Sequence, residues 1–350
     1  MSSKILLAGA TGYVGGTVLS TLLNTQDAAI KNASISVLVR NTQQAQVLEE
    51  KGISTVQVGD YTDTTAIAEL ASGYDVIVNG ASGFELGLAT ALIEGLAQRK
   101  KKLGVEVHYI HTSGTTNIAD SPLLDLYPGY KADPISDSSP AQLTSELRRL
   151  DAASPYIQRS VDLAVMDKGK ATGVKTHSIC LPMLFGVGTG LFRTVSGQIP
   201  ILVRGAIQAR QAWLVGDGSA LKGYVHIKDA ARVYEIAVSR VLRGLSVPYG
   251  EEGVMFVGDR EYTWNEVGEK IASVGKALGV LDTDKVKYVS MEEGGRLLGM
   301  DDMQYVEAAY VSSARATADI ARGLGWKPVY SDAFDEYFGD VWNIVLEEAK

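Results

Sequence analysis

The sequence predicts an α/β protein built on a doubly wound parallel sheet, with a smaller, mostly helical C-terminal subdomain. Three observations lead to this prediction. Short apolar runs alternate with stretches of helical length over residues 5–111. The first apolar run passes directly into three regularly spaced glycines that open a helix. The composition, 46% hydrophobic and 21% charged over 350 residues, is that of an ordinary globular protein of one large domain or two.

The first element is a buried strand, residues 5–8, followed by Gly9, Gly12 and Gly15 and a helix that continues to residue 23. A strand that turns sharply into a helix leaves the first N–H groups of the helix without partners. Together with the positive end of the helix dipole they form a site for a pyrophosphate. We expect Gly9 to allow the turn, Gly12 to let phosphates approach the backbone, and Gly15 to let the helix lie close to the strand. The alternative is a purely structural glycine-rich turn that binds no ligand.

Further strands are predicted at residues 34–39, 54–58, 75–79 and 106–111, with helices at residues 42–51, 64–72 and 84–102 between them. This alternation implies right-handed crossovers and a parallel sheet with helices on both faces. Each strand ends in small or polar residues, and ligands of such sheets lie across the carboxyl ends of the strands.

The regular pattern stops at residues 117–155, where several prolines and glycines mark turns around a short helix at 141–150. An irregular segment of this length inside a compact domain is typical of a functional loop or lid. A helix at 157–172 and a strand at 175–181 follow. We therefore assign residues 1–182 to a nucleotide-binding domain and residues 183–350 to a C-terminal subdomain whose elements interleave with the sheet.

The composition also limits which classes of binding partner and which cellular location we expect. The net charge of −8 and the absence of a basic stripe argue against nucleic acid. The single cysteine, Cys180, excludes an internal disulfide, and the four histidines show no metal-ligand spacing, so no metal is expected. No apolar run reaches membrane-spanning length and the first strand begins at once. We expect a cytoplasmic protein with a small-molecule partner and no membrane association.

Several ordered motifs resemble the extended short-chain dehydrogenase/reductase superfamily, which contains nucleotide-sugar epimerases and dehydratases. The likeness is greatest to atypical members, including proteins similar to the fungal regulator NmrA. The motifs span nearly the whole chain; the last two are Gly216-Asp217-Gly218 with residues 224–231, and residues 325–328. The resemblance implies a Rossmann-type fold and a substrate held under the C-terminal subdomain.

The same resemblance implies the cofactor-binding residues. The loop Gly9-Ala10-Thr11-Gly12-Tyr13-Val14-Gly15 corresponds to the cofactor loop of the family, and Asp60-Tyr61 matches the position that reaches the adenine. Gly80-Ala81-Ser82 matches the turn after the fourth strand, Thr112 lies at the end of the fifth, and residues 181–186, with Pro182 and Leu184, resemble the segment over the nicotinamide.

Cofactor preference is argued from charge. An acidic residue at the end of the second strand would accept a hydrogen bond from a ribose 2′-OH, whereas an arginine would favour a 2′-phosphate. This chain carries Arg40 there and no carboxylate before Glu49. The sequence therefore predicts NADP(H) in preference to NAD(H). The alternative is that Arg40 is a solvated residue at a strand end.

The resemblance implies chemistry by a Ser or Thr, a Tyr and a Lys, in which the Tyr exchanges a proton with the substrate. Ser113 matches the Ser, and Tyr156 is the expected Tyr, but Ser160 stands where the Lys should be. Without that cation a Tyr titrates near its ordinary value of about 10 and is a poor acid or base at neutral pH. The literal match, residues 127–131, contains Pro-Gly and reads as a turn in a lid or surface loop, with a catalytic role as the alternative left open.

Two functions remain open. One is an NAD(P)-dependent oxidoreductase or epimerase-like enzyme acting on a small carbonyl compound or secondary alcohol, with Ser113 orienting the substrate oxygen and Tyr156 as proton donor. The other, favoured by the missing lysine, is a non-catalytic NADP(H)-binding redox sensor of NmrA-like type. The resemblance also suggests a homodimer formed through the helices at 84–102 and 157–172.

Overall fold

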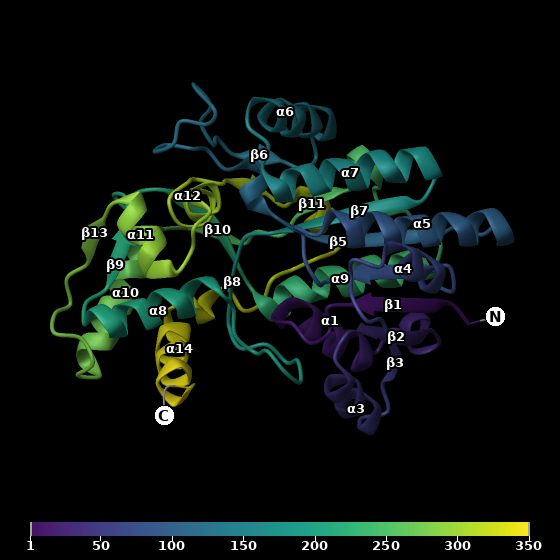
Figure 1. Cartoon of the computed structure of the whole chain (residues 1–350), viewed down its shortest axis with the longest axis horizontal. Coiled ribbons are helices and arrows are strands. Elements are labelled where there is room, and N and C mark those ends of the chain that lie inside the picture. Colours follow the sequence, from purple (N-terminus) through teal and green to yellow (C-terminus); the bar gives the residue numbers. More distant parts are fainter. Residues whose placement is uncertain (1, 349–350) are drawn as a thin grey trace.

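The computed structural model describes residues 2–348, and its centre is a parallel sheet of seven strands (Figure 1). The strand order is β11-β7-β5-β4-β1-β2-β3, and every neighbouring pair is parallel. The strands are β1 (Lys4–Ala8), β2 (Ser34–Val39), β3 (Ser54–Gln57), β4 (Val76–Asn79), β5 (His108–Gly114), β7 (Lys175–Leu181) and β11 (Val254–Phe256). The predicted doubly wound sheet is confirmed.

The strand order reverses between β1 and β4. From β1 the chain builds outward through β2 and β3, then returns to place β4, β5 and β7 on the other side of β1. Connections on the two sides of this point leave opposite faces of the sheet, which opens a crevice at the carboxyl ends of β1 and β4. Ligands of doubly wound folds bind in that crevice.

Helices cover both faces of the sheet. On one face α1 (Tyr13–Leu23) packs against α9 (Ile227–Leu242), and on the other α5 (Leu86–Leu103) lies between α4 (Thr64–Ala71) and α7 (Ile157–Thr172). Each face has its own apolar cluster. The remaining helices of the first half are α2 (Ala28–Lys31), α3 (Thr42–Glu50) and α6 (Pro140–Ala153), with a 3-10 turn at Thr115–Ile118.

The second half forms a smaller body around an aromatic core that includes Trp264, Trp342 and Phe334. Its strands are β8 (Met183–Phe185), β10 (Leu221–His226) and β12 (Arg260–Thr263) in one sheet, and β9 (Trp213–Val215) with β13 (Lys287–Val289) in another. Its helices are α8 (Gln198–Ala209), α10 (Trp264–Ala277), α11 (Met291–Leu298), α12 (Met303–Tyr310) and α14 (Phe334–Glu348), with 3-10 turns at Gly250–Glu252 and Ser331–Ala333.

The two halves share elements. Strand β11 forms the edge of the large sheet, and α9 packs on α1, although both come from the second half of the chain. The buried Asp137 carboxylate accepts hydrogen bonds from the backbone N–H of Phe256 (2.8 Å) and of Asp319 and Ile320 (2.9 Å each). Beside it, β6 (Ile135–Ser136) pairs with β14 (Ala316–Thr317), which leads into α13 (Asp319–Gly323). Residues 117–155 thus contain a strand that the sequence analysis did not predict.

A glycine-rich strap, residues 186–190, ties the second half to α1. The Tyr13 hydroxyl donates to the carbonyl oxygen of Gly186 at 2.7 Å. A Cβ added to Gly190 would lie 2.9 Å from the Cα of Gly16, so the two backbones touch.

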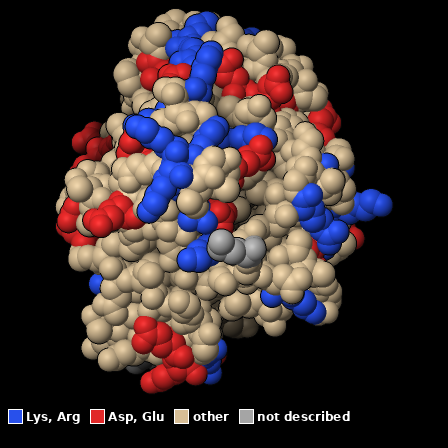
Figure 2. Space-filling model, turned by 90° about the vertical axis from the view of Figure 1, so that its right-hand side faces the viewer, with Lys and Arg blue, Asp and Glu red and all other residues tan. Residues whose placement is uncertain are grey.

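The face at which α5 ends, on the right of Figure 1, carries both signs of charge (Figure 2). The basic cluster at the end of α5 is anchored, since Arg99 pairs with Asp75 at 2.6 Å and the Lys100 ammonium donates to the Gly173 carbonyl oxygen. None of the helices formed by residues 2–348 is long and apolar enough to cross a membrane.

Candidate cofactor and substrate cleft

The glycine loop between β1 and α1 has no room for side chains at two of its three glycines. Gly9 has φ +86°, and a Cβ added there would lie 2.4 Å from the backbone nitrogen of Ala81. A Cβ on Gly15 would lie 2.2 Å from the carbonyl oxygen of Gly9. Gly12 is different, because a Cβ there would meet only the Gly9 carbonyl oxygen, at 3.2 Å. The space in front of Gly12, at the N-terminus of α1, is therefore open, as a bound pyrophosphate requires.

The turn after β4 is fitted closely to this loop. A Cβ on Gly80 would lie 3.0 Å from the Cα of Gly15, and the Gly80 N–H donates to the Ala8 carbonyl oxygen at 2.9 Å. Asn79 accepts from the Ala81 N–H at 3.2 Å, and the Ser82 hydroxyl oxygen accepts from the Phe84 N–H at 3.1 Å. The residues thus form a cradle that fits the dinucleotide predicted from the sequence.

Arg40, Asp60 and Tyr61 lie together at the carboxyl ends of β2 and β3. The Arg40 guanidinium carbon is 4.4 Å from the centre of the Tyr61 ring. The hydrogen bond from the Thr62 N–H, with a smaller contribution from Arg40, holds the pKa of the Asp60 carboxyl below its usual value. Arg40 is exposed and, among the described residues, makes no ion pair within 4.0 Å. Its guanidinium is therefore available to an anionic group on a ligand.

A cleft of about 400 Å³ runs from the cofactor loop to the C-terminal body across the ends of β1, β4, β5 and β7. The residues predicted from the sequence that line it are Tyr13, Val14, Gly80, Ala81, Ser82, Thr112, Ser113, Pro182 and Leu184. The predicted residues that do not line it are Gly9, Thr11, Gly12 and Gly15 of the loop, Arg40, Asp60 and Tyr61 at the far strands, and Tyr156.

Tyr156 lies outside the cleft. It precedes the first turn of α7, is 2% exposed, and its hydroxyl is 3.4 Å from the Thr116 hydroxyl oxygen. Burial raises the pKa of the Tyr156 phenol above its ordinary value, although Arg159 lies near the ring. Ser160, one turn later, donates to Asp151 at 2.8 Å. The Tyr156–Ser160 side of the helix therefore does not meet Ser113.

Gln158 and Asp162, one helical turn apart, lie instead on the side of α7 that faces the end of β5, and of the two only Gln158 lines the cleft. Gln158 lines the cleft and accepts from the Thr116 hydroxyl at 2.6 Å, and a Cβ on Gly114 would lie 2.8 Å from its Oε1. Asp162 lies one turn further into the protein, with no exposed surface. Sequence reasoning missed both residues. The available signal was two polar residues at i and i+4 on the otherwise apolar side of α7.

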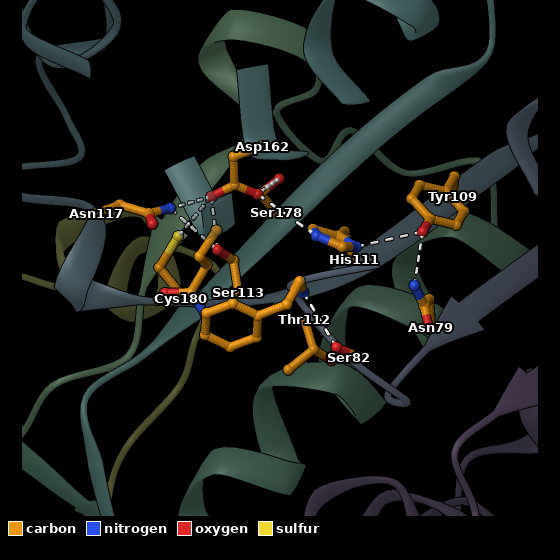
Figure 3. A network of polar contacts seen from close by, with 12 residues as sticks. Asn79, Ser82, Tyr109, His111, Thr112, Ser113, Asn117, Asp162, Ser178 and Cys180 are labelled. Carbon is orange, nitrogen blue, oxygen red and sulfur yellow. Dashed lines mark hydrogen bonds and ion pairs between the residues drawn. The ribbon is translucent and has the colours of Figure 1, made fainter. Parts of the chain in front are cut away.

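Asp162 is the centre of a buried polar network (Figure 3). Ser113 donates to its Oδ2 at 2.6 Å and Ser178 to its Oδ1 at 3.0 Å, and Asn117 Nδ2 donates both to the carboxylate and to the Ser113 hydroxyl oxygen, the latter at 3.1 Å. No Lys or Arg of residues 2–348 lies within 4.0 Å of this carboxylate. Burial raises the pKa of Asp162 from 3.8 to about 6, even though these donors oppose the rise.

The network continues along β5 toward the cofactor turn. His111 Nε2 is 3.7 Å from Asp162 Oδ1, and His111 Nδ1 is 3.2 Å from the Tyr109 hydroxyl, which accepts from Asn79 at 2.8 Å. Burial lowers the pKa of His111 to about 4, so the ring is neutral. His111 is thus a core residue, but one in contact with the candidate site.

A second unpredicted residue is Lys222 on β10. It is the one basic side chain among the described residues that line the cleft, and it is 4% exposed. Its ammonium donates to the carbonyl oxygens of Ala308 and Ala309 near the end of α12, the latter at 3.3 Å. Burial lowers its pKa to about 7, and the nearby Asp120 opposes the shift.

Comparison with known proteins identifies the family. Residues 5–247 match the model of the NAD-dependent epimerase/dehydratase family. The chain belongs to this family. It is 28% identical over 340 residues to a protein named oxidase ucsJ from Acremonium sp., with 94% of each chain covered.

Solved structures share the fold of this family member. UDP-glucose 4-epimerase from Thermotoga maritima, solved with UDP-glucose, superposes with a TM-score of 0.64 at 13% identity, covering 99% of this chain and 100% of the other. The dTDP-glucose 4,6-dehydratase DesIV from Streptomyces venezuelae, solved with NAD and TYD, gives a TM-score of 0.65 at 18% identity, covering 98% and 97%. The predicted resemblance to extended reductases is confirmed.

Two other sequence motifs of this chain, residues 127–131 and the segment around Asp229, have structural roles. In the literal Tyr-x-x-x-Lys match, Tyr127 is buried, its hydroxyl accepts from Arg159 at 3.2 Å, and neither Tyr127 nor Tyr130 lines the cleft. Asp229 accepts from the N–H groups of Val329 and Tyr330 at 3.0 and 2.9 Å. These two bonds hold the start of α9 against residues 329–330, which follow the motif at residues 325–328.

Proposed function

We propose that the protein is an NAD(P)-dependent oxidoreductase that interconverts a secondary alcohol and a carbonyl group on a small substrate. The observation that carries the proposal is the position of Ser113. Ser113 lines the same cleft as the turn after β4, and its hydroxyl donates a hydrogen bond to the buried Asp162 at 2.6 Å. A polar hydroxyl held by a carboxylate beside a dinucleotide site is suited to orienting a substrate oxygen. The oxidase name of the Acremonium relative supports redox chemistry.

The dinucleotide would be held by the glycine loop, the β4 turn and the far strands. When bound, its nicotinamide accepts or supplies a hydride. The N-terminus of α1 would bind the pyrophosphate, and Asp60 with Tyr61 would contact the adenosine end. We propose NADP(H) in preference to NAD(H), because Arg40 stands at the end of β2 and makes no ion pair with a carboxylate of residues 2–348. Structures of the same fold were solved with NAD, so the proposed preference for NADP(H) is argued from Arg40 of this chain alone.

The substrate would be smaller than a nucleotide sugar. A diphosphate carries at least two negative charges, whereas Lys222 is the one basic side chain of the described cleft lining, and its donors already serve two carbonyl oxygens. The rest of the lining is hydroxyl, amide and apolar. A small carbonyl compound or alcohol with at most one anionic group suits this surface. We also propose a homodimer through α5 and α7.

A second candidate function is a dinucleotide-binding sensor of NmrA-like type without turnover. The position of Tyr156 favours it, since the hydroxyl expected to donate a proton is buried against Thr116 outside the cleft. Ser160, in place of the lysine, contacts Asp151 instead.

One experiment separates the two candidates. The purified protein is titrated with NADPH and NADH by fluorescence, and the complex is then incubated with a panel of small ketones, aldehydes and secondary alcohols while absorbance of the reduced cofactor is followed. The enzyme hypothesis expects turnover that Ser113→Ala reduces without weakening dinucleotide binding. Tight binding without turnover across the panel would favour the sensor. Failure to bind either dinucleotide would contradict both.

A further inference from the structure

The structure assigns Asp162 the role of proton acceptor behind Ser113, so that the Ser113 hydroxyl relays a proton between the substrate oxygen and this buried carboxylate. The inference rests on the proposed oxidoreductase function. It gives the chain an acid–base pair of its own where the expected Tyr and Lys are missing from the cleft.

The hydrogen bonds around Ser113 fix the direction of the relay. A serine hydroxyl has one hydrogen to donate and two lone pairs that accept. Its hydrogen goes to Asp162 Oδ2 at 2.6 Å, and Asn117 Nδ2 occupies one lone pair at 3.1 Å. The second lone pair is left to accept the hydroxyl hydrogen of a substrate in the cleft, which Ser113 lines. Asn117 also donates to Asp162, so one amide holds both members of the relay.

The groups around Asp162 are neutral, so the carboxyl can take up and release a proton and is not held ionised by an ion pair. The titratable groups that face it are Tyr109 and His111 from β5 and Cys180 from β7. Burial keeps all three neutral, since it lowers the pKa of His111 to about 4 and raises those of Tyr109 and Cys180 above their ordinary values. The carboxyl, with its pKa raised to about 6, is therefore the group of this network that exchanges a proton near neutral pH.

The step balances as follows for alcohol oxidation. The O–H bond of the substrate breaks, its proton bonds to Ser113 Oγ, and the Ser113 proton bonds to Asp162 Oδ2. The O–H electron pair becomes the second bond of the carbonyl group as the carbon loses a hydride to the oxidised dinucleotide named above. After product release the proton leaves Asp162 through Ser113 to water. Reduction of a carbonyl runs the same path in reverse.

The test compares Asp162→Asn with Ser178→Ala, a matched control that removes a donor to the same carboxylate but leaves Ser113 in place. We expect oxidation by the wild type to fall below a pH of about 6, and Asp162→Asn to lower kcat by about 100-fold or more and abolish this pH dependence. Ser178→Ala should keep the acidic limb, moved to higher pH because the ionised form loses a hydrogen bond. NADPH affinity should stay within about 2-fold in both variants, because neither residue touches the cofactor cradle.

A readout independent of turnover is infrared titration of the resting protein. The relay requires a protonated-carboxyl band in the difference between the wild-type and Asp162→Asn spectra, where the Asp137 band with its similar pKa cancels, and this difference band appears as the pH falls through about 6. If Asp162→Asn fails to fold, Ser113→Ala and Ser113→Thr replace it, and only the threonine, which keeps the hydroxyl, should retain activity. Wild-type turnover that Asp162→Asn leaves unchanged, or a carboxyl that stays ionised to a pH of about 4, would overturn the relay alone. Dinucleotide binding without wild-type turnover would overturn the proposed function and the relay with it.

Discussion

Replacing Asp162 with Asn should make the protein more stable at neutral pH while removing the proposed relay. The folded-state pKa of this carboxyl is raised from 3.8 to about 6, because burial penalises the charged form. A raised pKa means that the stabilising contribution is complete below the unfolded-state value and is lost as the pH rises through the folded-state value. Above a pH of about 7 the ionised carboxylate thus costs roughly 3 kcal/mol relative to its protonated form.

The asparagine does not ionise, so it avoids this cost. It replaces one acceptor oxygen by a donor. With the amide nitrogen at the Oδ1 position, the Ser178 hydroxyl can rotate to accept from it, while Ser113 and Asn117 keep an acceptor oxygen that has lost its charge. Allowing about 1 kcal/mol for that loss, we expect Asp162→Asn to raise the free energy of unfolding by about 2 kcal/mol at pH 7.5.

The assay is urea unfolding of wild type and Asp162→Asn between pH 5 and pH 7.5, read as the difference between the two proteins. Other titrating groups, such as Asp137, cancel in this difference. The linkage predicts that the stability advantage of the variant grows by roughly 1 kcal/mol across the range, since the wild type has lost only about half of this stability at pH 5. A difference that does not change with pH, or a wild type that is the more stable protein at pH 7.5, would refute the reasoning.

Three further predictions concern the cleft. Arg40→Asp should weaken NADPH binding by about 10- to 100-fold and affect NADH much less, measured by fluorescence titration; equal losses for both cofactors would contradict the 2′-phosphate argument. Gly15→Ala should abolish dinucleotide binding and cost about 1–3 kcal/mol in urea unfolding, since its Cβ would lie 2.2 Å from the Gly9 carbonyl oxygen. Gly339→Ala in α14, where an added Cβ meets nothing within 4 Å, is the matched control and should bind normally. Tyr156→Phe should change kcat by no more than about 2-fold in the turnover assay, because the hydroxyl lies outside the cleft; a large loss of kcat with unchanged KM would restore Tyr156 as the proton donor.

The sequence was sufficient for features set by local backbone chemistry. Apolar runs such as residues 34–39 and 175–181 became strands with the predicted bounds, and the glycine spacing revealed a loop in which Gly15 packs against the nearby carbonyl oxygen of Gly9. The strand β10 was missed because Lys222 and Gly223 interrupt its apolar pattern. A lysine can occupy that position only because carbonyl oxygens from α12, some 90 residues later in the chain, receive its protons.

The centre of the site depended on partners that no local pattern reveals. Asp162 is tolerated inside the protein because Ser113 and Ser178 come from two different strands, at separations of 49 and 16 residues. Tyr156 was chosen by its residue type and its position at the expected start of the helix. The register of α7 decides which side chains reach the end of β5, and a shift of two residues exchanges Tyr156 and Ser160 for Gln158 and Asp162.

The edge position of β11 has a consequence for how the chain is made. While the ribosome is still synthesising residues 182–253, the sheet ends at β7, whose backbone groups on that side are a template for another chain. At that stage Asp137 lacks its hydrogen-bond donors, because the N–H groups of Phe256, Asp319 and Ile320 have not yet been synthesised. The nascent N-terminal half is thus an incomplete sheet exposed to aggregation, and fragments that stop before residue 254 should need a chaperone or a solubilising fusion to remain in solution.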